Sequence, residues 1–371
     1  MDHMGRVRKL QERLPESGLD CFLATHLPNV RYLSGFSGSA GALLVSERGA
    51  TLFTDGRYRT QAEEEVRGAR VVIGAKAPAV AAAEWMAAHG GKTSVRSRMG
   101  SQNRPVIGIE GETLTVGMRD RVAAALRGKA RVRSAPDLVG RARMVKDAAE
   151  LAAIRRAAKL GASLLRIACE EIRPGKREVE IAAAMEYEAR RQGAEGMSFP
   201  TILAAGERSA VVHGRASQVR IPRRGFVVCD FGVILAGYCS DRTRTVHVGR
   251  PSSKARQFYG AVLEAQLAAI DAVRAGVTAE DVDAAARNVL KKRKLARYFT
   301  HSLGHGLGLE IHESPRIAAG QGLVLEPGMV ITIEPGAYVP GKWGVRIEDV
   351  VVVTDSGCEV LAPDDKDLVV I

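Results

Sequence analysis

The chain has 371 residues, of which 46% are hydrophobic, and its formal net charge is +12. This length predicts two domains, and no apolar run approaches the roughly 18 residues that a membrane-spanning helix needs. Aromatic residues make up only 5% of the chain, and no nucleic-acid-binding module is recognisable. The basic runs at 92–104 and 127–146 therefore indicate a solvated, arginine-rich surface, and we expect neither membrane nor nucleic-acid binding.

The N-terminus is charged and lacks the apolar core of a signal peptide; Met1 and Met4 are both candidate initiating residues. The five cysteines are scattered, odd in number and without a C-x-x-C pair. Such cysteines are typical of reduced thiols. These features predict a cytoplasmic protein.

Residues 1–137 alternate strand and helix signals, which predicts a small α/β domain. Apolar runs predict strands over 21–24, 42–45 and 51–53. A helix is predicted over 79–89, with Gly90-Gly91 as its end. After Pro136 the alternating strand and helix signals give way to a long helical periodicity. We therefore place a linker at 138–145 and a second domain at 146–371.

The second domain opens with a long helical pattern over 148–171 and contains an internal repeat. A turn at 173–175 precedes a predicted helix at 178–183, and a turn at 274–276 precedes one at 281–286. Each helix is followed by a histidine-containing stretch and then by a segment with two carboxylates. The repeat predicts pseudo-twofold halves with helix pairs on the back of a curved sheet.

Two apolar, β-branched segments at 227–241 and 331–349 each predict a β-hairpin that carries a pair of carboxylates. The pairs are Asp230 with Asp241 and Glu334 with Glu348. The first pair is equidistant from a centre between Leu235 and Ala236, and the second pair is equidistant from Gly341. Symmetric strand pairing would place the Cβ atoms of each pair about 4.5–5.5 Å apart.

Two carboxylates at that distance repel each other and resist ionisation unless a cation lies between them. One pair alone is compatible with a proton-sharing dyad, but two pairs around a histidine-rich stretch indicate metal. The histidines of that stretch are His301, His305 and His312. The alternative interpretation, solvated surface carboxylates, is less favoured. Asp230 and Glu334 each end an apolar run, where a lone charge would be costly to bury. Four carboxylates and one imidazole suit two divalent ions, most simply Mn²⁺, with Co²⁺ and Zn²⁺ as alternatives.

Three segments resemble the signature of the metal-dependent proline peptidases: 300–313, 332–336 and 345–349. The resemblance extends over nearly the whole chain. These are the aminopeptidase P and prolidase enzymes of the pita-bread fold, which are related to methionine aminopeptidase and creatinase. The resemblance implies an α+β fold, in which a smaller α/β creatinase-like N-terminal domain precedes a pita-bread catalytic domain. That catalytic domain is a pseudo-twofold, curved antiparallel sheet covered by helices.

The resemblance also implies site residues. The implied metal ligands are Asp230, Asp241, His305, Glu334 and Glu348, with Asp241 and Glu348 bridging both ions. Glu334 is also implied in catalysis, and the residues implied in substrate binding and proton transfer are His213, His301, His312 and Arg346. The complete ligand set argues against creatinase and the non-enzymatic relatives. His301 and Arg346 argue against methionine aminopeptidase, which usually lacks both.

These residues predict an exopeptidase that cleaves the bond between an N-terminal residue and a following proline. Glu334 would relay the proton of the attacking water, and His312 with His213 would stabilise the oxyanion and protonate the leaving nitrogen. His301 and Arg346 would form walls around the proline ring. His247 lies too far along its strand to join the metals, so we expect it to be structural.

We favour Xaa-Pro aminopeptidase activity, because segments 29–41 and 53–58 resemble N-terminal motifs common in aminopeptidase P enzymes. Xaa-Pro dipeptidase (prolidase) activity is the alternative. A dipeptidase must recognise the free carboxylate of proline, usually with an arginine, and composition does not locate such a residue. A metal-free binding protein on the same fold is the third hypothesis. The expected partners are proline-containing peptides with a free N-terminus and, from the resemblance, a second copy of the chain in a homodimer.

Overall fold

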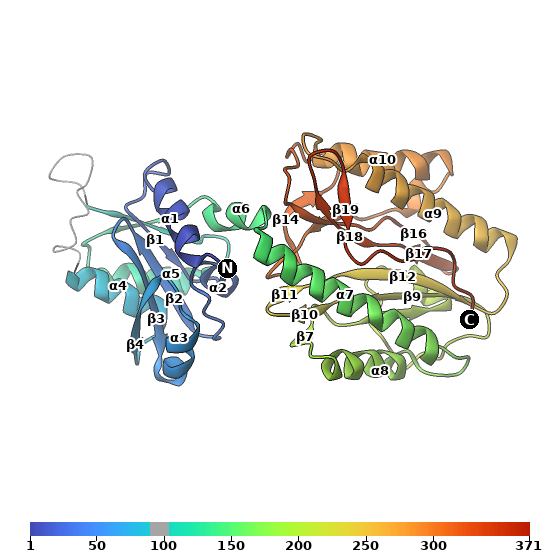
Figure 1. Ribbon diagram of the computed structural model, residues 1–371, viewed down its shortest axis with the longest axis horizontal. Helices are drawn as coiled ribbons and strands as arrows, with labels where there is room; N and C mark the ends of the chain where they lie inside the picture. Colours follow the sequence, from blue (N-terminus) through green and yellow to red (C-terminus); the bar gives the residue numbers. More distant parts are fainter. Residues whose placement is uncertain (90–103) are drawn as a thin grey trace. The chain divides into compact units, whose positions relative to one another are not determined.

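The computed structural model describes residues 1–89 and 104–371, which divide into two compact units, Met1–Arg143 and Met144–Ile371 (Figure 1). The predicted helix end at Gly90-Gly91 and residues 92–103 of the first basic run lie outside the described residues. Within the described residues, every helix is too short or too polar to cross a bilayer. All five cysteines are free thiols.

The first unit is built on a six-stranded mixed sheet with the strand order β4-β3-β2-β1-β5-β6. Its strands are β1 (Cys21–Ala24), β2 (Gly41–Ser46), β3 (Gly49–Asp55), β4 (Ala69–Gly74), β5 (Val106–Ile109) and β6 (Arg131–Ser134). Strand β2 runs antiparallel to β1 and β3, whereas β3–β4, β1–β5 and β5–β6 pair in parallel. The three strands predicted from apolar runs are confirmed.

Helices connect and cover this sheet. They are α1 (His3–Arg13), α2 (Leu27–Ser34), α3 (Arg59–Glu65), α4 (Pro78–His89), α5 (Val116–Ala125) and α6 (Leu138–Met144). Helix α4 confirms the helix predicted over 79–89. The segment 138–145, which we expected to be a linker, contains α6. This segment is anchored to α2: Arg143 donates to Asn29 (2.7 Å) and Tyr32 Oη donates to the Ala142 carbonyl (3.2 Å).

The second unit carries two helix pairs, which lie along its sheets in Figure 1. They are α7 (Ala148–Glu171) with α8 (Glu178–Arg191), and α9 (Ser253–Ala272) with α10 (Ala279–Lys292). A capping box starts α7: the Asp147 side chain accepts from Glu150 N, and the Glu150 side chain accepts from Asp147 N. The helices predicted over 148–171, 178–183 and 281–286 are confirmed.

The strands of the second unit pair antiparallel in four small sheets, ordered β11-β10-β7, β12-β9-β8, β14-β13-β15-β18-β19 and β16-β17. The first half contributes β7 (Gly196–Met197), β8 (Ile202–Ala205), β9 (Gly225–Phe231), β10 (Val233–Leu235), β11 (Tyr238–Cys239) and β12 (Arg242–Val248). The second half contributes β13 (Gly304–Gly306), β14 (Glu313–Ile317), β15 (Val330–Ile333), β16 (Gly336–Val339), β17 (Trp343–Arg346), β18 (Asp349–Val353) and β19 (Cys358–Val360).

The predicted repeat is confirmed, because each half packs its own helix pair on its own strands. Leu164 and Met185 from α7 and α8 are fully buried with Val227 of β9. Val262 and Val282 from α9 and α10 are fully buried in a second apolar core, together with Ile331 of β15. The architecture agrees with the one that the resemblance implied: a smaller α/β unit precedes a unit of two halves, each with a helix pair on antiparallel strands.

The predicted register is confirmed for the second hairpin and wrong for the first. Pairing in β15–β18 and β16–β17 is symmetric about Gly341, which places Glu334 opposite Glu348. In the first hairpin Asp230 pairs with Thr243, so Asp241 is its diagonal neighbour. The centre lies one position later than predicted because Ala236 and Gly237 form the turn, both with positive φ (52° and 78°).

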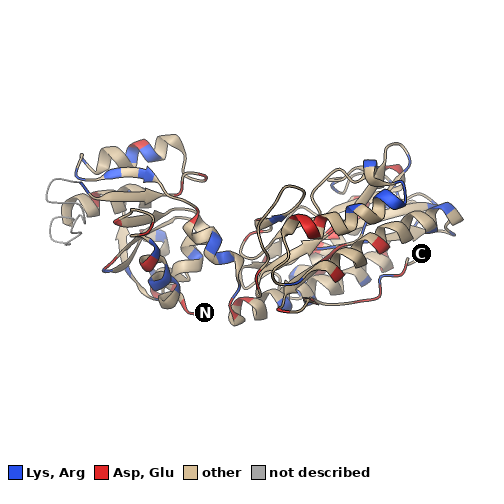
Figure 2. Cartoon of the chain, turned by 90° about the horizontal axis from the view of Figure 1, so that it is seen from above, with Lys and Arg blue, Asp and Glu red and all other residues tan. Residues whose placement is uncertain are grey.

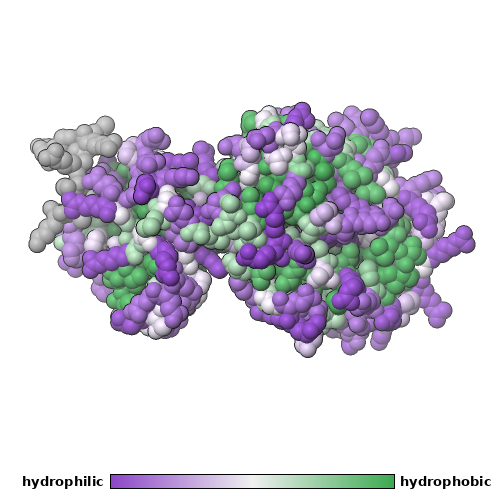
Figure 3. Space-filling view, in the orientation of Figure 1, coloured by the Kyte–Doolittle hydropathy of each residue, from purple (hydrophilic) through white to green (hydrophobic). Residues whose placement is uncertain are grey.

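Charges and apolar side chains are dispersed over the surface. In Figure 2, basic and acidic segments alternate along the helices of the second unit, so the positive charge is not gathered on one element. On the face shown in Figure 3, hydrophobic side chains are separated by hydrophilic ones in both units. This distribution fits the solvated, arginine-rich surface expected from the sequence.

Candidate metal centre

The predicted ligands stand where strands of the second unit end or break. Asp241 lies between β11 and β12, Glu334 between β15 and β16, and Glu348 between β17 and β18. Asp230 is the penultimate residue of β9, and His305 is the middle residue of β13. A strand that breaks can turn a side chain out of the regular alternation, as bulges do next to active sites. All five side chains line one cavity of about 730 Å³.

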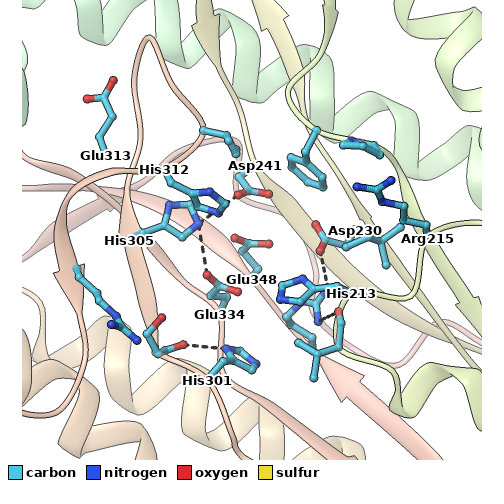
Figure 4. A pocket seen from close by; sticks show the side chains of 18 of the residues that line it. His213, Arg215, Asp230, Asp241, His301, His305, His312, Glu313, Glu334 and Glu348 are labelled. Atoms are coloured by element: carbon cyan, nitrogen blue, oxygen red, sulfur yellow. Dashed lines mark hydrogen bonds and ion pairs between the residues drawn. The ribbon is translucent and has the colours of Figure 1, made fainter. Parts of the chain in front are cut away.

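Three of the five predicted ligands come together most closely. Asp241, His305 and Glu348 each offer one ligand atom, and these atoms lie within 4.8 Å of one another. Glu334 is beside them, since its Oε1 lies 3.5 Å from His305 Nε2, which is also 3.6 Å from Asp241 Oδ2. Figure 4 shows these side chains pointing into a common space, with Asp230 on its far side.

Asp230 is held apart from that triad by a buried guanidinium. Its Oδ2 accepts from Arg346 Nη2 in an ion pair. Its Oδ1 is buried and has no hydrogen-bond partner among the described residues. A buried carboxylate oxygen without a partner is costly, and a cation in the cavity would satisfy it.

His305 is oriented as a neutral metal ligand. Its Nδ1 lies 2.9 Å from the carbonyl of Gly306, so a proton on Nδ1 leaves Nε2 with its lone pair toward the carboxylates. Burial is the main cause that lowers the pKa of His305 to about 4. The ring is therefore neutral at pH 7, which is the form that binds metals.

Three carboxylates of the cavity have raised pKa values, in contrast to the lowered pKa of His305. Burial raises the pKa of Glu334 to about 8, although the charge of Arg346 opposes the shift. Burial, followed by the charge of Glu348, also raises the pKa of Asp241. The pKa of Glu348 is raised by burial and then by Glu334 and Asp230. Oxygen donors that resist ionisation until a cation arrives, together with one neutral imidazole, fit divalent metal ions.

A hydrogen-bonded chain links the predicted substrate-binding residues to Asp230. His301 Nε2 lies 3.0 Å from Tyr338 Oη, and Arg346 Nη1 donates to the same hydroxyl (2.7 Å). Arg346 Nε also donates to Thr243 Oγ1 (3.2 Å), which in turn donates to Glu348 Oε2 (2.7 Å). Arg346 thus touches the cavity while fixing residues on both halves of the unit.

The sequence analysis did not identify Tyr338 and Thr243 as residues of the site. Strand alternation could have identified both, because alternate residues of a strand share a face. Tyr338 has the parity of Glu334, and Thr243 has the parity of Asp241.

His213 and His312 lie on exposed loops at the mouth of the cavity. The His312 ring is 4.4 Å from that of His305, centroid to centroid, in an edge-to-face arrangement. Partial burial, with the charge of His213 as the second cause, lowers the pKa of His312. The loop of His312 is braced by its neighbour Glu313, which also lines the cavity and pairs with Lys146 (3.2 Å).

Two exposed arginines, Arg215 and Arg316, also line the cavity and were not singled out by the sequence. The two arginines lie about a hundred residues apart in the sequence, in different halves of the unit, so no local motif links them to one cavity. The apolar part of the lining includes Phe199, Pro200, Ile202, Val212 and Ile311. His247 does not line the cavity: it is buried in β12 and its Nδ1 lies 2.8 Å from the Gly249 carbonyl, which agrees with the expected structural role.

Comparison with known proteins covers both units. The family model described as metallopeptidase family M24 matches residues 152–355, and the creatinase/prolidase N-terminal domain model matches residues 6–145. The Xaa-Pro dipeptidase of Pyrococcus furiosus is 38% identical over 364 residues, which are 98% of this chain and 99% of that protein.

Two solved structures are also similar over the full chain. The Xaa-Pro dipeptidase of Bacillus anthracis superposes with a TM-score of 0.92 at 37% identity, covering 100% of both chains. The X-Pro aminopeptidase of Thermotoga maritima superposes with a TM-score of 0.85 at 35% identity, covering 99% of both chains.

The first prediction concerns the protein after metal removal. The contribution of Glu334 to its stability should fall as the pH rises from 4.5 to about 8, because the folded protein keeps the Glu334 proton until about pH 8, whereas the unfolded chain releases it near 4.5. At this residue the unfolded state then binds fewer protons, so its contribution to the free energy of unfolding decreases with pH. The midpoint of urea unfolding, measured across this range in a chelator, tests it. Glu334→Gln should reduce the slope, and an unchanged slope would contradict the assignment.

The second prediction concerns metal content. Asp241→Ala should weaken Mn²⁺ binding by roughly 100-fold or more. Removing a residue that only hydrogen-bonds to a metal ligand already lowers metal affinity about 10–100-fold. Mn²⁺ retained after dialysis against a limiting concentration, measured by elemental analysis, gives the result. Asp355→Ala, on an exposed turn of the same unit, is the control. Equal retention by the two variants would remove Asp241 from the metal site.

Proposed function

The chain belongs to metallopeptidase family M24, and we propose that it is an Xaa-Pro dipeptidase that uses two divalent metal ions. The observation that carries the proposal is the convergence of Asp241, His305 and Glu348, with Asp230 and Glu334, on one cavity. Xaa-Pro dipeptidases similar over the whole chain support the choice of substrate. Aminopeptidase activity, which we favoured from the sequence, has less support from these relatives. It is the second candidate, because the similar Thermotoga maritima structure is an X-Pro aminopeptidase.

We propose that all five predicted ligands hold the metal: Asp230, Asp241, His305, Glu334 and Glu348. An oxygen-rich set with a single imidazole favours Mn²⁺, with Co²⁺ or Zn²⁺ as alternatives. When bound, such ions polarise the carbonyl of the bond to be cleaved and make a water nucleophilic at neutral pH. Arg346 holds Asp230 in place through its buried ion pair.

The protein's own groups would move the protons. The Glu334 carboxylate accepts the proton of the attacking water, for which its position beside His305 is suitable. The leaving group is the proline nitrogen, which carries no N–H of its own in the peptide. His312 at the cavity mouth would pass to this nitrogen the proton that Glu334 has taken from the water. His213, which faces His312, stabilises the oxyanion that forms at the carbonyl carbon.

Recognition of proline would rest on shape at one end and on charge at the other. The apolar side chains of Ile202, Val212 and Ile311 offer contacts for a ring without a hydrogen-bond donor. Arg215 and Arg316 offer guanidinium groups for a free carboxylate, which pairs with arginine in charge-assisted hydrogen bonds. A dipeptide presents that carboxylate directly after proline, whereas a longer peptide presents an amide there.

The proposals on location and assembly rest on the sequence. We propose a cytoplasmic protein, from the scattered cysteines without a C-x-x-C pair, and a homodimer, from the family resemblance.

The third prediction tests the dipeptidase assignment. With Mn²⁺ supplied, the protein should hydrolyse Xaa-Pro dipeptides with a kcat/KM at least about tenfold above that for Xaa-Pro-Xaa tripeptides, which corresponds to about 1.4 kcal/mol of transition-state binding. Release of proline and of the N-terminal residue is measured for peptides of graded length. Higher kcat/KM for tripeptides would favour the aminopeptidase, and no turnover of any peptide would favour a binding protein on this fold.

The fourth prediction concerns the two cavity arginines. A charge-assisted hydrogen bond contributes about 1.5–3 kcal/mol, so replacing the arginine that holds the carboxylate should lower kcat/KM for dipeptides by roughly 10- to 100-fold. Arg215→Ala, Arg316→Ala and the double variant are compared on dipeptides and on their C-terminal amides, for which the loss should be small. Arg256→Ala, exposed on α9, is the matched control. Dipeptide activity equal to the control in all three variants would exclude a carboxylate clamp by these residues.

A further inference from the structure

The last eleven residues, 361–371, form a segment that we call the C-terminal strap. At its start, Leu361 N donates to the Val350 carbonyl of β18 (2.8 Å). At its end, His247 N donates to the Val369 carbonyl (2.9 Å) and Ile371 N donates to the His247 carbonyl (2.9 Å), so the C-terminus lies beside β12 (Figure 1). The strap therefore connects a strand of the second half to a strand of the first.

The strap crosses the seam at which the two halves meet. At this seam Glu348 N donates to the Thr243 carbonyl (3.1 Å), and Thr243 Oγ1 donates to Glu348 Oε2 (2.7 Å). Thr245 Oγ1 donates to the Arg346 carbonyl (2.8 Å). The metal-site carboxylate of Glu348 is thus held by β12, a strand of the opposite half.

Side chains of the strap complete a charge cluster at this seam, in which Arg242, Arg244 and Asp349 are buried and Asp364 closes the solvent side. Asp364 forms ion pairs with Arg242 and Arg244, whose side chains are only 5% and 4% exposed. Lys366 pairs with Asp349 (2.5 Å), which also pairs with Arg244 (2.7 Å). Without Asp364, Arg242 would lose the carboxylate that it pairs with, and Arg244 would keep only Asp349. An unpaired buried charge is strongly unfavourable.

Arg244 connects the cluster to the metal site. Its Nη1 donates to the carbonyl of Glu348 (2.5 Å) and to the carbonyl of Thr243 (3.0 Å). It therefore fixes the backbone of both residues that set the Glu348 carboxylate. A guanidinium that turned away to find another partner would release this backbone, and the carboxylate would move relative to Asp241 and His305.

We infer that the C-terminal strap is a positioning element of the metal site, in which Asp364 and Lys366 hold Arg244 and Asp349 so that Glu348 faces Asp241 and His305. The inference rests on the proposed metal-binding role of Glu348. It assigns to the strap a part in metal affinity, although none of its residues lines the cavity.

The test is Mn²⁺ binding to the full-length, metal-free chain, measured by isothermal titration calorimetry at a temperature where circular dichroism shows the native fold. Asp364→Asn should lower the Mn²⁺ affinity by roughly tenfold or more, as partners behind metal ligands do. Asp364→Glu keeps the carboxylate and should retain more of the affinity. Asp355→Asn makes the same change of charge on an exposed turn of the same unit and should bind Mn²⁺ as the unmodified chain does.

A merely structural strap would lower the thermal midpoint of the metal-free protein in Asp364→Asn while leaving the Mn²⁺ affinity of the folded protein equal to that of Asp355→Asn. That result overturns the inference and leaves the proposed function standing. If Asp364→Asn does not fold, Lys366→Met decides by the same comparison, since it removes the other tether of the strap. An unmodified chain that binds neither Mn²⁺, Co²⁺ nor Zn²⁺ would overturn the proposed function and the inference with it.

Discussion

Four carboxylates converge on one largely buried cavity, and their mutual repulsion is the constraint on which the second unit depends. Asp230, Asp241, Glu334 and Glu348 share this space with only one buried guanidinium, that of Arg346. Burial raises the pKa of three of them, which means that the folded chain tolerates their charge poorly without cations. An arrangement that stores this much repulsion is expected at a functional site rather than in a structural core.

The duplicated architecture is what makes such crowding achievable. Each half supplies one hairpin with two carboxylates, and the helix pair behind each hairpin gives it an apolar core of its own. A third buried cluster joins the halves, since Ile154 of α7 and Tyr238 of β11 pack with Val330 and Val350 of the second half. The carboxylates are therefore anchored to two packed halves whose strands also meet at Thr243 and Glu348. Neither hairpin alone brings together the oxygen donors and the imidazole that two metal ions require.

Buried arginines hold the two halves in register around the cavity. Arg346, from the second half, donates to Thr243 and pairs with Asp230 of the first half. Arg244, from the first half, donates to the Glu348 carbonyl and pairs with Asp349 of the second half. Each guanidinium has several donors in one plane, so each satisfies acceptors from both halves simultaneously. The outer layer of this network reaches the end of the chain through Asp364 and Lys366.

Local patterns in the sequence determined helices α4, α7, α8 and α10, the repeat, the register about Gly341 and the family to which the chain belongs. Capping residues, apolar periodicity and motif spacing act over a few neighbours, so they can be read without coordinates. Only the tertiary structure decided the register of the first hairpin, whose centre lies between Ala236 and Gly237, because the positive φ of an alanine cannot be predicted from sequence. It also decided which arginines face the cavity and how the C-terminal strap meets β12. These contacts join segments far apart in the chain, and their partners are chosen by packing of the whole unit, which no local pattern encodes.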